Sequence, residues 1–304
     1  QLAHDIPLWR GVDQEGGRVA RLRAPFTEWP PMASLGRLGE AALTKRFAAA
    51  LADELTAVGV NLNFSPVLDI YNESADKVIG DRALSSDSNE VGRLGEVIIE
   101  TLQRGGIAAC AKHFPGHGSA RADSHYELPV VEHSPERLRE YEMSPFRNAI
   151  VADVAMVMTA HVLYPALDDR RMATVSKTIV DEILRGELRH QGLIVTDDLD
   201  MGAVTKFQTV EQAAVSALDA GCDTVLICGD SVDRHASVME SIIHAVEEDK
   251  LDACRIERAW IRQERVKARF MERGGHGRPL SGKALRNRLG RASFQALAEE
   301  ISGG

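Results

Sequence analysis

Long apolar runs are missing from this 304-residue sequence, although 44% of its residues are hydrophobic. No segment approaches the roughly 18 consecutive apolar residues that a membrane-spanning helix needs, so we expect no membrane association. Positive charge is also scarce, because 36 Lys and Arg against 45 Asp and Glu give a formal net charge of -9. An acidic chain of this kind is a poor partner for nucleic acid or for an anionic membrane.

Cysteine is equally sparse, with four residues: Cys110, Cys222, Cys228 and Cys254. Their spacing fits neither a zinc site nor a disulfide framework, so we expect free thiols and a cytoplasmic location. The glycine patterns of nucleotide-binding loops are absent as well, and we expect no cofactor. The composition is otherwise that of an ordinary globular protein with a full hydrophobic core.

What the chain does contain is a regular alternation of short apolar segments and amphipathic helical patterns. Six segments have the character of buried strands: residues 6–12, 60–64, 107–111, 154–158, 193–196 and 224–228. Between them, apolar residues recur at spacings of three and four, as at Leu43, Phe47 and Leu51. This alternation predicts a parallel sheet that is covered by helices on both faces.

A doubly wound open sheet and a (β/α)8 barrel both fit this alternation. Every strand-like segment, however, is followed by polar side chains that can do chemistry: Asp13, Asp69, Lys112 with His113, His161, Asp197 and Asp230. In a barrel all these strand ends face one mouth, whereas an open sheet needs only the loops at its switch point. The pattern therefore favours a TIM-type barrel in which six of eight βα units are visible.

The two remaining units are expected upstream, because Gln1 is not a start methionine and the first strand-like segment begins within a few residues of it. No linker divides the chain, so residues 1–304 are expected to form a single catalytic barrel domain. Residues 274–304 are rich in glycine and arginine, and we expect a loosely packed exterior tail there.

The stretch from Ala111 to Pro129, AKHFPGHGSARADSHYELP, concentrates reactive side chains in a loop. His113 and His117 could bind a metal if they lay on a helix, but Pro115 and Gly116 between them oppose a helix. The polar groups could also do no more than satisfy the loop backbone. A catalytic hypothesis pairs Asp123 with His125, since a neighbouring carboxylate orients an imidazole and makes it a better general acid and base.

Two acidic motifs follow other strands. In DQEGGRVAR, residues 13–21, the glycines let the backbone approach a ligand, and the Asp13 carboxylate can accept hydrogen bonds from sugar hydroxyls. In LIVTDDLDM, residues 193–201, Asp197 is nearest the strand end. Solvated turn charges remain an alternative for the first motif, and helix capping by Asp198 or Asp200 for the second.

Taken together, KHFPGHG with DSH and LP, DQEGGRVAR, IGDR and TDDLDM resemble, in content and order, glycoside hydrolase family 3. More narrowly, they resemble its bacterial NagZ-type β-N-acetylglucosaminidases over about residues 12–270. The resemblance implies a (β/α)8 barrel with two strands before DQEGG, and a retaining mechanism. Retention normally uses two carboxyl groups about 5–5.5 Å apart, but NagZ-type enzymes replace one of them with a histidine.

The resemblance also implies roles for individual residues. Asp197 would be the nucleophile, His125 the acid and base, and Asp123 its orienting partner. Positions that hold N-acetylglucosamine in the family correspond to Asp13, Arg21, Arg82, Lys112 and His113, to which we add His161 because it ends a strand.

The expected activity is release of terminal β-linked N-acetylglucosamine from peptidoglycan-derived muropeptides by a cytoplasmic monomer without metal or cofactor. Three alternatives stay open: a phosphorylase of the same family, a non-catalytic N-acetylglucosamine-binding protein and a metal-dependent hydrolase.

Overall fold

The computed structural model describes residues 8–73, 78–120, 123–124, 126–229, 231–271 and 279–303. Its centre is a sheet of six strands, all parallel to their neighbours. Along the sheet these are β1 (Gly11–Val12), β4 (Leu62–Asn63), β5 (Ala108–Phe114), β6 (Met156–Thr159), β7 (Leu193–Asp198) and β8 (Thr224–Leu226). All six strands that the sequence predicts are therefore present.

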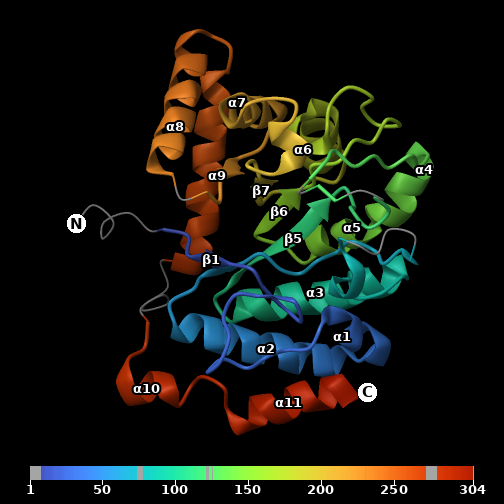
Figure 1. Ribbon diagram of the computed structural model, residues 1–304, viewed down its shortest axis with the longest axis vertical. Coiled ribbons are helices and arrows are strands. Elements are labelled where there is room, and N and C mark those ends of the chain that lie inside the picture. Colours follow the sequence, from blue (N-terminus) through green and yellow to red (C-terminus); the bar gives the residue numbers. More distant parts are fainter. Residues whose placement is uncertain are drawn as a thin grey trace.

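The order of the strands along the sheet is also their order along the chain. A doubly wound sheet reverses direction at a switch point, and this sheet does not. In Figure 1 the strands lie at the centre of the molecule, between helices α1 to α3 on one side and α7 to α9 on the other. The α/β class and the parallel sheet are confirmed, while a closed barrel of eight units stays a prediction.

Helices follow the strands as the apolar spacing predicts. The first group consists of α1 (Met32–Leu38), α2 (Ala41–Ala57), α3 (Ser88–Arg104), α4 (Pro135–Arg137), the π-helical η4 (Leu138–Glu142) and α5 (Ser144–Val151). The second consists of the π-helical η6 (Thr178–Glu187), α6 (Gly202–Thr205), α7 (Val210–Ala220), α8 (Val232–Glu247), α9 (Ala253–Met271), α10 (Gly282–Arg286) and α11 (Ala292–Gly303). Two 3-10 turns, η3 (Gly80–Arg82) and η5 (Ala173–Val175), lie in loops.

Local signals mark where several helices begin. The hydroxyl of Ser134 accepts a hydrogen bond from the backbone N–H of Arg137, and Pro135 occupies the first turn of α4, as predicted. Thr209 and Gln212 form a capping box at the start of α7. Within the described ranges, no helix combines the length and the apolar character that crossing a membrane requires.

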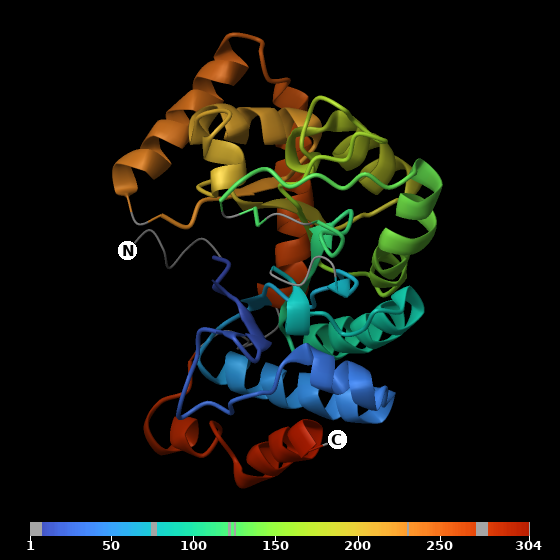
Figure 2. The ribbon, with the colours of Figure 1, turned by 45° about the vertical axis from the view of Figure 1, so that its right-hand side comes forward.

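The two faces of the sheet pack differently. On one face, alternate residues such as Ala109, Val157 and Ile194 join a large core with the surrounding helices. On the other face, their neighbours form a second cluster with Val266 and Phe270 of α9: these include Ala108, Cys110, Met156, Met158, Leu193 and Val195. The C-terminal half of α9 thus covers this second face of the sheet, beside β7. Figure 2 shows α9 running next to the strands.

The end of the chain is packed more firmly than the sequence suggests. Leu297, Ala298 and Ile301 of α11 are buried in the large core, where α11 lies against α1 and α2. The backbone N–H of Gly290 donates to the buried carboxylate of Glu54 at 2.7 Å. The apolar stripe of α11 thus packs against α2 more closely than a loose tail would, whereas α10 has no buried residue.

Candidate active site

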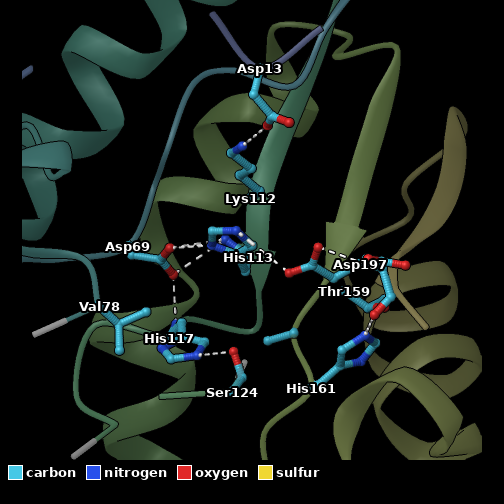
Figure 3. Close-up of polar contacts among 12 residues, drawn as sticks. Asp13, Asp69, Val78, Lys112, His113, His117, Ser124, Thr159, His161 and Asp197 are labelled. Atoms are coloured by element: carbon cyan, nitrogen blue, oxygen red, sulfur yellow. Dashed lines mark hydrogen bonds and ion pairs between the residues drawn. The ribbon is translucent and has the colours of Figure 1, made fainter. Parts of the chain in front are cut away.

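The C-terminal ends of β1, β5 and β7 bring polar side chains from distant parts of the sequence together (Figure 3). The motif that follows β1 forms a small antiparallel hairpin, β2 (Gln14–Gly16) with β3 (Val19–Ala20). Gly17 makes the turn at φ 54°, where a Cβ would lie 2.9 Å from Pro31. Glycine is needed at this position because the backbone is left-handed and the contact is close.

Lys112 lies at the centre of a group of charged side chains and contacts two carboxylates. Its Nζ lies 2.8 Å from Asp13 Oδ1 and 2.7 Å from Glu15 Oε1. Arg82 in turn donates two hydrogen bonds to the Glu15 carboxylate, at 2.8 and 2.9 Å. Burial lowers the pKa of Lys112, but the two carboxylates outweigh it and raise the pKa, so the amine is charged. This arrangement joins the DQEGGR, GDR and KH motifs in one place.

His113 lies between two carboxylates. Its Nδ1 is 2.6 Å from Asp69 Oδ2, and its Nε2 is 3.9 Å from Asp197 Oδ2. The peptide bond between Lys112 and His113 is cis, and both side chains lie in the site. Strand alternation alone would send these neighbours to opposite faces of the sheet.

Asp197 at the end of β7 has the environment that a nucleophilic carboxylate needs. Burial alone would raise its pKa, but the electrostatic interactions with His113 and Lys112 and the hydrogen bond from the backbone N–H of Asp198 outweigh burial, so the pKa is lowered. The carboxylate is therefore ionised at neutral pH, while its side chain keeps 22% of its surface exposed. An ionised, accessible carboxylate can attack an electrophilic carbon or bind a cationic group.

The loop after β5 approaches the loop after β4 at two points. The backbone N–H of His117 donates to Asp69 Oδ1 at 2.6 Å. At Gly118, a Cβ would lie 1.9 Å from the carbonyl oxygen of Ile70, so only glycine fits there. Further along, His117 Nε2 is 3.2 Å from the hydroxyl of Ser124. Asp123 precedes this serine and is half-buried, whereas His125, the predicted acid and base, falls outside the described residues.

His161 is fully buried and engages both ring nitrogens within the protein. Its Nε2 donates to the backbone carbonyl of Asp198 at 3.0 Å, and its Nδ1 lies 2.7 Å from Thr174 Oγ1. Burial lowers its pKa, so the ring is neutral at pH 7. In this arrangement the side chain supports the end of β7 and offers no ring nitrogen to a sugar.

The other acids after β7 have structural partners. Asp198 Oδ1 accepts from the backbone N–H groups of Asp200 and Cys228, and Asp200 pairs with Arg234. They thus tie β7 to β8 and to the start of α8, and neither caps α6 through its side chain. Within the residues that the structure describes, no group of three potential metal ligands is assembled.

The structure thus unites several residues that the motifs single out and leaves Arg21 at the margin of the site. Asp13, Lys112, His113 and Asp197 lie together, with Arg82 joined to them through Glu15. The side chain of Arg21 is exposed, and its backbone N–H donates to Gln14 Oε1. Asp69 and Glu15 were not predicted as site residues. The sequence shows Asp69 only as an acid that follows the predicted strand 60–64, and the place of Glu15 in the DQEGGR motif is the signal that could have identified it.

Comparisons with known proteins identify the family of the chain. The model of the glycosyl hydrolase family 3 N-terminal domain matches residues 1–267. A β-hexosaminidase of Idiomarina loihiensis is 41% identical over 228 residues, which cover 74% of this chain and 68% of that protein.

Among solved structures, a family 3 β-N-acetylglucosaminidase from Paenibacillus sp. str. FPU-7 superposes with a TM-score of 0.92 and 40% identity. The match covers 98% of this chain and 56% of that one, so this chain spans little more than half of that relative. The β-glucoside phosphorylase BglX has a TM-score of 0.90 at 22% identity, over 99% of this chain and 56% of its own, a likeness of fold alone. The family expected from the motifs is confirmed: the chain belongs to glycosyl hydrolase family 3 and is related to its β-hexosaminidases.

Proposed function

We propose that this protein is a retaining glycosidase that releases terminal β-linked N-acetylglucosamine. The observation that carries the proposal is the ionised Asp197 carboxylate, which faces His113 at 3.9 Å beside the Lys112–Asp13 pair. Asp197 would attack the anomeric carbon to form a covalent glycosyl-enzyme, and water would then release the sugar. Asp13, Lys112, His113 and Arg82 would orient the sugar hydroxyls and the acetamido group, with Arg21 at the edge of the site.

The acid and base of this reaction would be His125, oriented by Asp123. A general acid must be protonated near neutral pH, and the carboxylates beside Asp197 are unsuited to that task. Burial raises the pKa of Glu15, but Lys112 and Arg82 lower it to about 2. The pKa of Asp69 is also lowered, because its interactions with His113 and the hydrogen bond from the backbone N–H of His117 outweigh the effect of burial. Their ionised state leaves the acid role to a group of another type, which favours an imidazole.

The proposed natural substrates are peptidoglycan-derived muropeptides, with the protein acting as a cytoplasmic monomer that uses neither metal nor cofactor. The β-hexosaminidase names of the relatives support the sugar, and the muropeptide aglycone follows from the motif resemblance alone. A phosphorylase is the second candidate, because a histidine acid does not repel an incoming phosphate as a carboxylate would. The superposition with the β-glucoside phosphorylase BglX means that the fold is compatible with either acceptor.

One set of assays tests the proposal. Chromogenic β-N-acetylglucosaminide and β-glucoside are incubated with the protein, with and without inorganic phosphate, and before and after chelation. We expect release of the chromophore and free N-acetylglucosamine from the first substrate only, unchanged by chelation. Sugar 1-phosphate as the product would establish the phosphorylase, and binding without release would identify a sugar-binding protein.

The nucleophile is tested separately with Asp197→Ala. This variant is expected to lose nearly all turnover and to accumulate no glycosyl-enzyme, because the bond-forming atom is gone. Substantial residual turnover with the activated substrate would contradict the assignment of Asp197.

A further inference from the structure

Asp69 is a completely buried carboxylate that the roles proposed above do not use. Its Oδ2 lies 2.6 Å from Nδ1 of His113, and its Oδ1 accepts the backbone N–H of His117 at 2.6 Å. Both oxygens also lie 3.2 Å from the backbone nitrogen of His113. A buried carboxylate without such donors would be costly, so its three N–H partners account for its presence.

The opposite side of the His113 ring faces a second carboxylate, because Nε2 is directed at Asp197 Oδ2 (Figure 3). A neutral imidazole has one N–H and one lone pair, so it can donate to only one of two flanking carboxylates. Only the protonated ring presents an N–H to both, as a hydrogen bond to Asp69 at 2.6 Å and as a longer ion pair with Asp197 at 3.9 Å. With a neutral ring, the unprotonated nitrogen would point its lone pair at a negatively charged oxygen.

We infer that Asp69 is a positioning residue that holds His113 as an imidazolium, with Nδ1–H bound to Asp69 and Nε2–H directed toward Asp197 and the sugar. This inference rests on the proposed function where it names Asp197 as the nucleophile and a sugar as the ligand. The imidazolium lies beside the attacking carboxylate, where its charge keeps that carboxylate ionised, and its free N–H direction is available to a hydroxyl of the substrate.

The other charged groups around His113 are consistent with this charge state. His117 and His161 are buried, and burial lowers the pKa of His117 to about 4 and also lowers that of His161, so both rings are neutral. Lys112 is engaged by Asp13 and Glu15, and Arg82 by Glu15. The cation in direct contact with Asp69 is therefore His113.

Asp69 also connects His113 to the loop that carries the predicted acid and base. From its Oδ1 the contacts continue through the His117 backbone to the His117 ring, and from that ring to the hydroxyl of Ser124. The carbonyl oxygen of Ser124 accepts from the backbone N–H of Ala203 at 3.0 Å. Ala203 follows Asp197 on the same segment, so the contacts form a closed circuit between the nucleophile strand and the loop. Asp69 is thus linked both to the strand that carries Asp197 and to the loop segment at Ser124.

The charge of His113 can be read directly from long-range proton–nitrogen correlation spectra at pH 7. An imidazolium shows two protonated ring nitrogens with similar nitrogen shifts, and a neutral ring shows one protonated and one unprotonated nitrogen with widely separated shifts. The spectrum of His113→Gln identifies the signals. We expect the imidazolium pattern in the wild type, and a neutral His113 there would overturn the inference, whether or not the protein has any activity.

Asp69→Asn then tests whether Asp69 is the cause. The amide keeps the shape but offers one acceptor oxygen and no charge, so we expect His113 to become neutral and kcat/KM to fall about 10²-fold, the cost of misplacing groups in an active site. A persistent imidazolium with unchanged kcat/KM would contradict the role of Asp69. Should this variant not fold, the wild-type spectrum still decides the charge state.

Glu54→Gln is the matched control, because Glu54 is also buried and accepts backbone N–H and hydroxyl groups, from Thr27 and Gly290. It should leave both the His113 signals and kcat/KM unchanged. Loss of the same signals in this variant would mean that a general loss of stability, and not the Asp69 carboxylate, determines the charge state of the His113 ring. Wild-type protein with an imidazolium but no turnover would count against the proposed function and leave the charge assignment standing.

Discussion

We propose that acid catalysis depends on His125, and its contribution should then depend on the leaving group. If His125 protonates the departing oxygen, His125→Ala should lower kcat/KM about 10²–10⁴-fold for a substrate with a poor alkyl leaving group. The loss should be much smaller with a dinitrophenyl leaving group, which departs without a proton. Steady-state kinetics over a series of leaving groups measures this dependence.

The outcome that contradicts this assignment is an equal loss with every leaving group. That result would mean that His125 holds the substrate or the loop rather than transferring a proton. Azide offers a further check, because it attacks a glycosyl-enzyme without a general base. It should accelerate His125→Ala with the activated substrate and produce the glycosyl azide.

At the scale of single residues, the sequence predicted which side chains meet in the site but not every contact between them. Asp13, Lys112, His113 and Asp197 lie at the ends of predicted strands. Because parallel strands end at one edge of a sheet, this location correctly predicted that the four side chains meet. The same rule identified Asp69 as a strand-end acid but not its function, since that depends on a contact with His113 across 44 residues of sequence. Pairing over such a distance leaves no local pattern in the sequence.

At the scale of elements, Glu15 joins three of them: the β2–β3 hairpin, strand β5 through Lys112 and the η3 turn through Arg82. Its pKa is lowered to about 2 from the value of 4.5 that a free glutamate has, because both cations outweigh the effect of burial. The charged form therefore stabilises the fold above pH 4.5, and this stabilisation is lost as pH falls from 4.5 toward 2.

Glu15→Gln should accordingly reduce the free energy of unfolding by about 3–5 kcal/mol at pH 7, the usual cost of leaving a buried partner unpaired. The difference from the wild type should shrink below pH 4.5, where the wild type itself loses the charge. Urea denaturation at pH 3, 5 and 7 measures it, with Glu28→Gln on the surface as the control. A difference that does not vary with pH would show that Glu15 acts through packing rather than charge.

The terminal helix α11 gives a second prediction for an element. Ile301 is fully buried against the core, so Ile301→Ala should lower the free energy of unfolding by about 2–5 kcal/mol through lost burial and the cavity that remains. The exposed Glu299→Ala on the same helix should change it by less than about 0.5 kcal/mol. Thermal unfolding of both variants measures the effect. Equal melting temperatures would mean that α11 is detached in solution.

Helix positions were largely predictable, since apolar spacing and caps are local features. The partners of the helices were not. An apolar stripe indicates that a helix packs against another element, but it does not identify that element. For this reason the sequence predicted a loose tail where α11 packs. It also gave no sign that Val266 and Phe270 of α9 pack on the face of the sheet formed by Ala108, Met156 and Leu193. Both contacts join segments that are far apart in the chain.

For the whole molecule, strand order followed from the regular alternation of strands and helices, and the six predicted strands occur in that order. The sequence could not determine whether the sheet closes, because closure depends on strand number and tilt rather than on any one motif. What matters for the chemistry is that β1, β5 and β7 end on the same edge. A sugar bound across these strand ends, as we propose, would contact Asp13 and Asp197, which lie 184 residues apart in the sequence.

This placement predicts a response of the entire sheet to ligand. N-acetylglucosamine at 100 times its Kd should add about 2.7 kcal/mol to the free energy of unfolding. It should also slow amide hydrogen exchange together in residues 13–16, 112–118 and 197–203, which follow or end three different strands. Glucose, which lacks the acetamido group, is the control and should protect these segments less at equal concentration. Protection confined to one of the three segments would mean that the sugar binds elsewhere than across the strand ends.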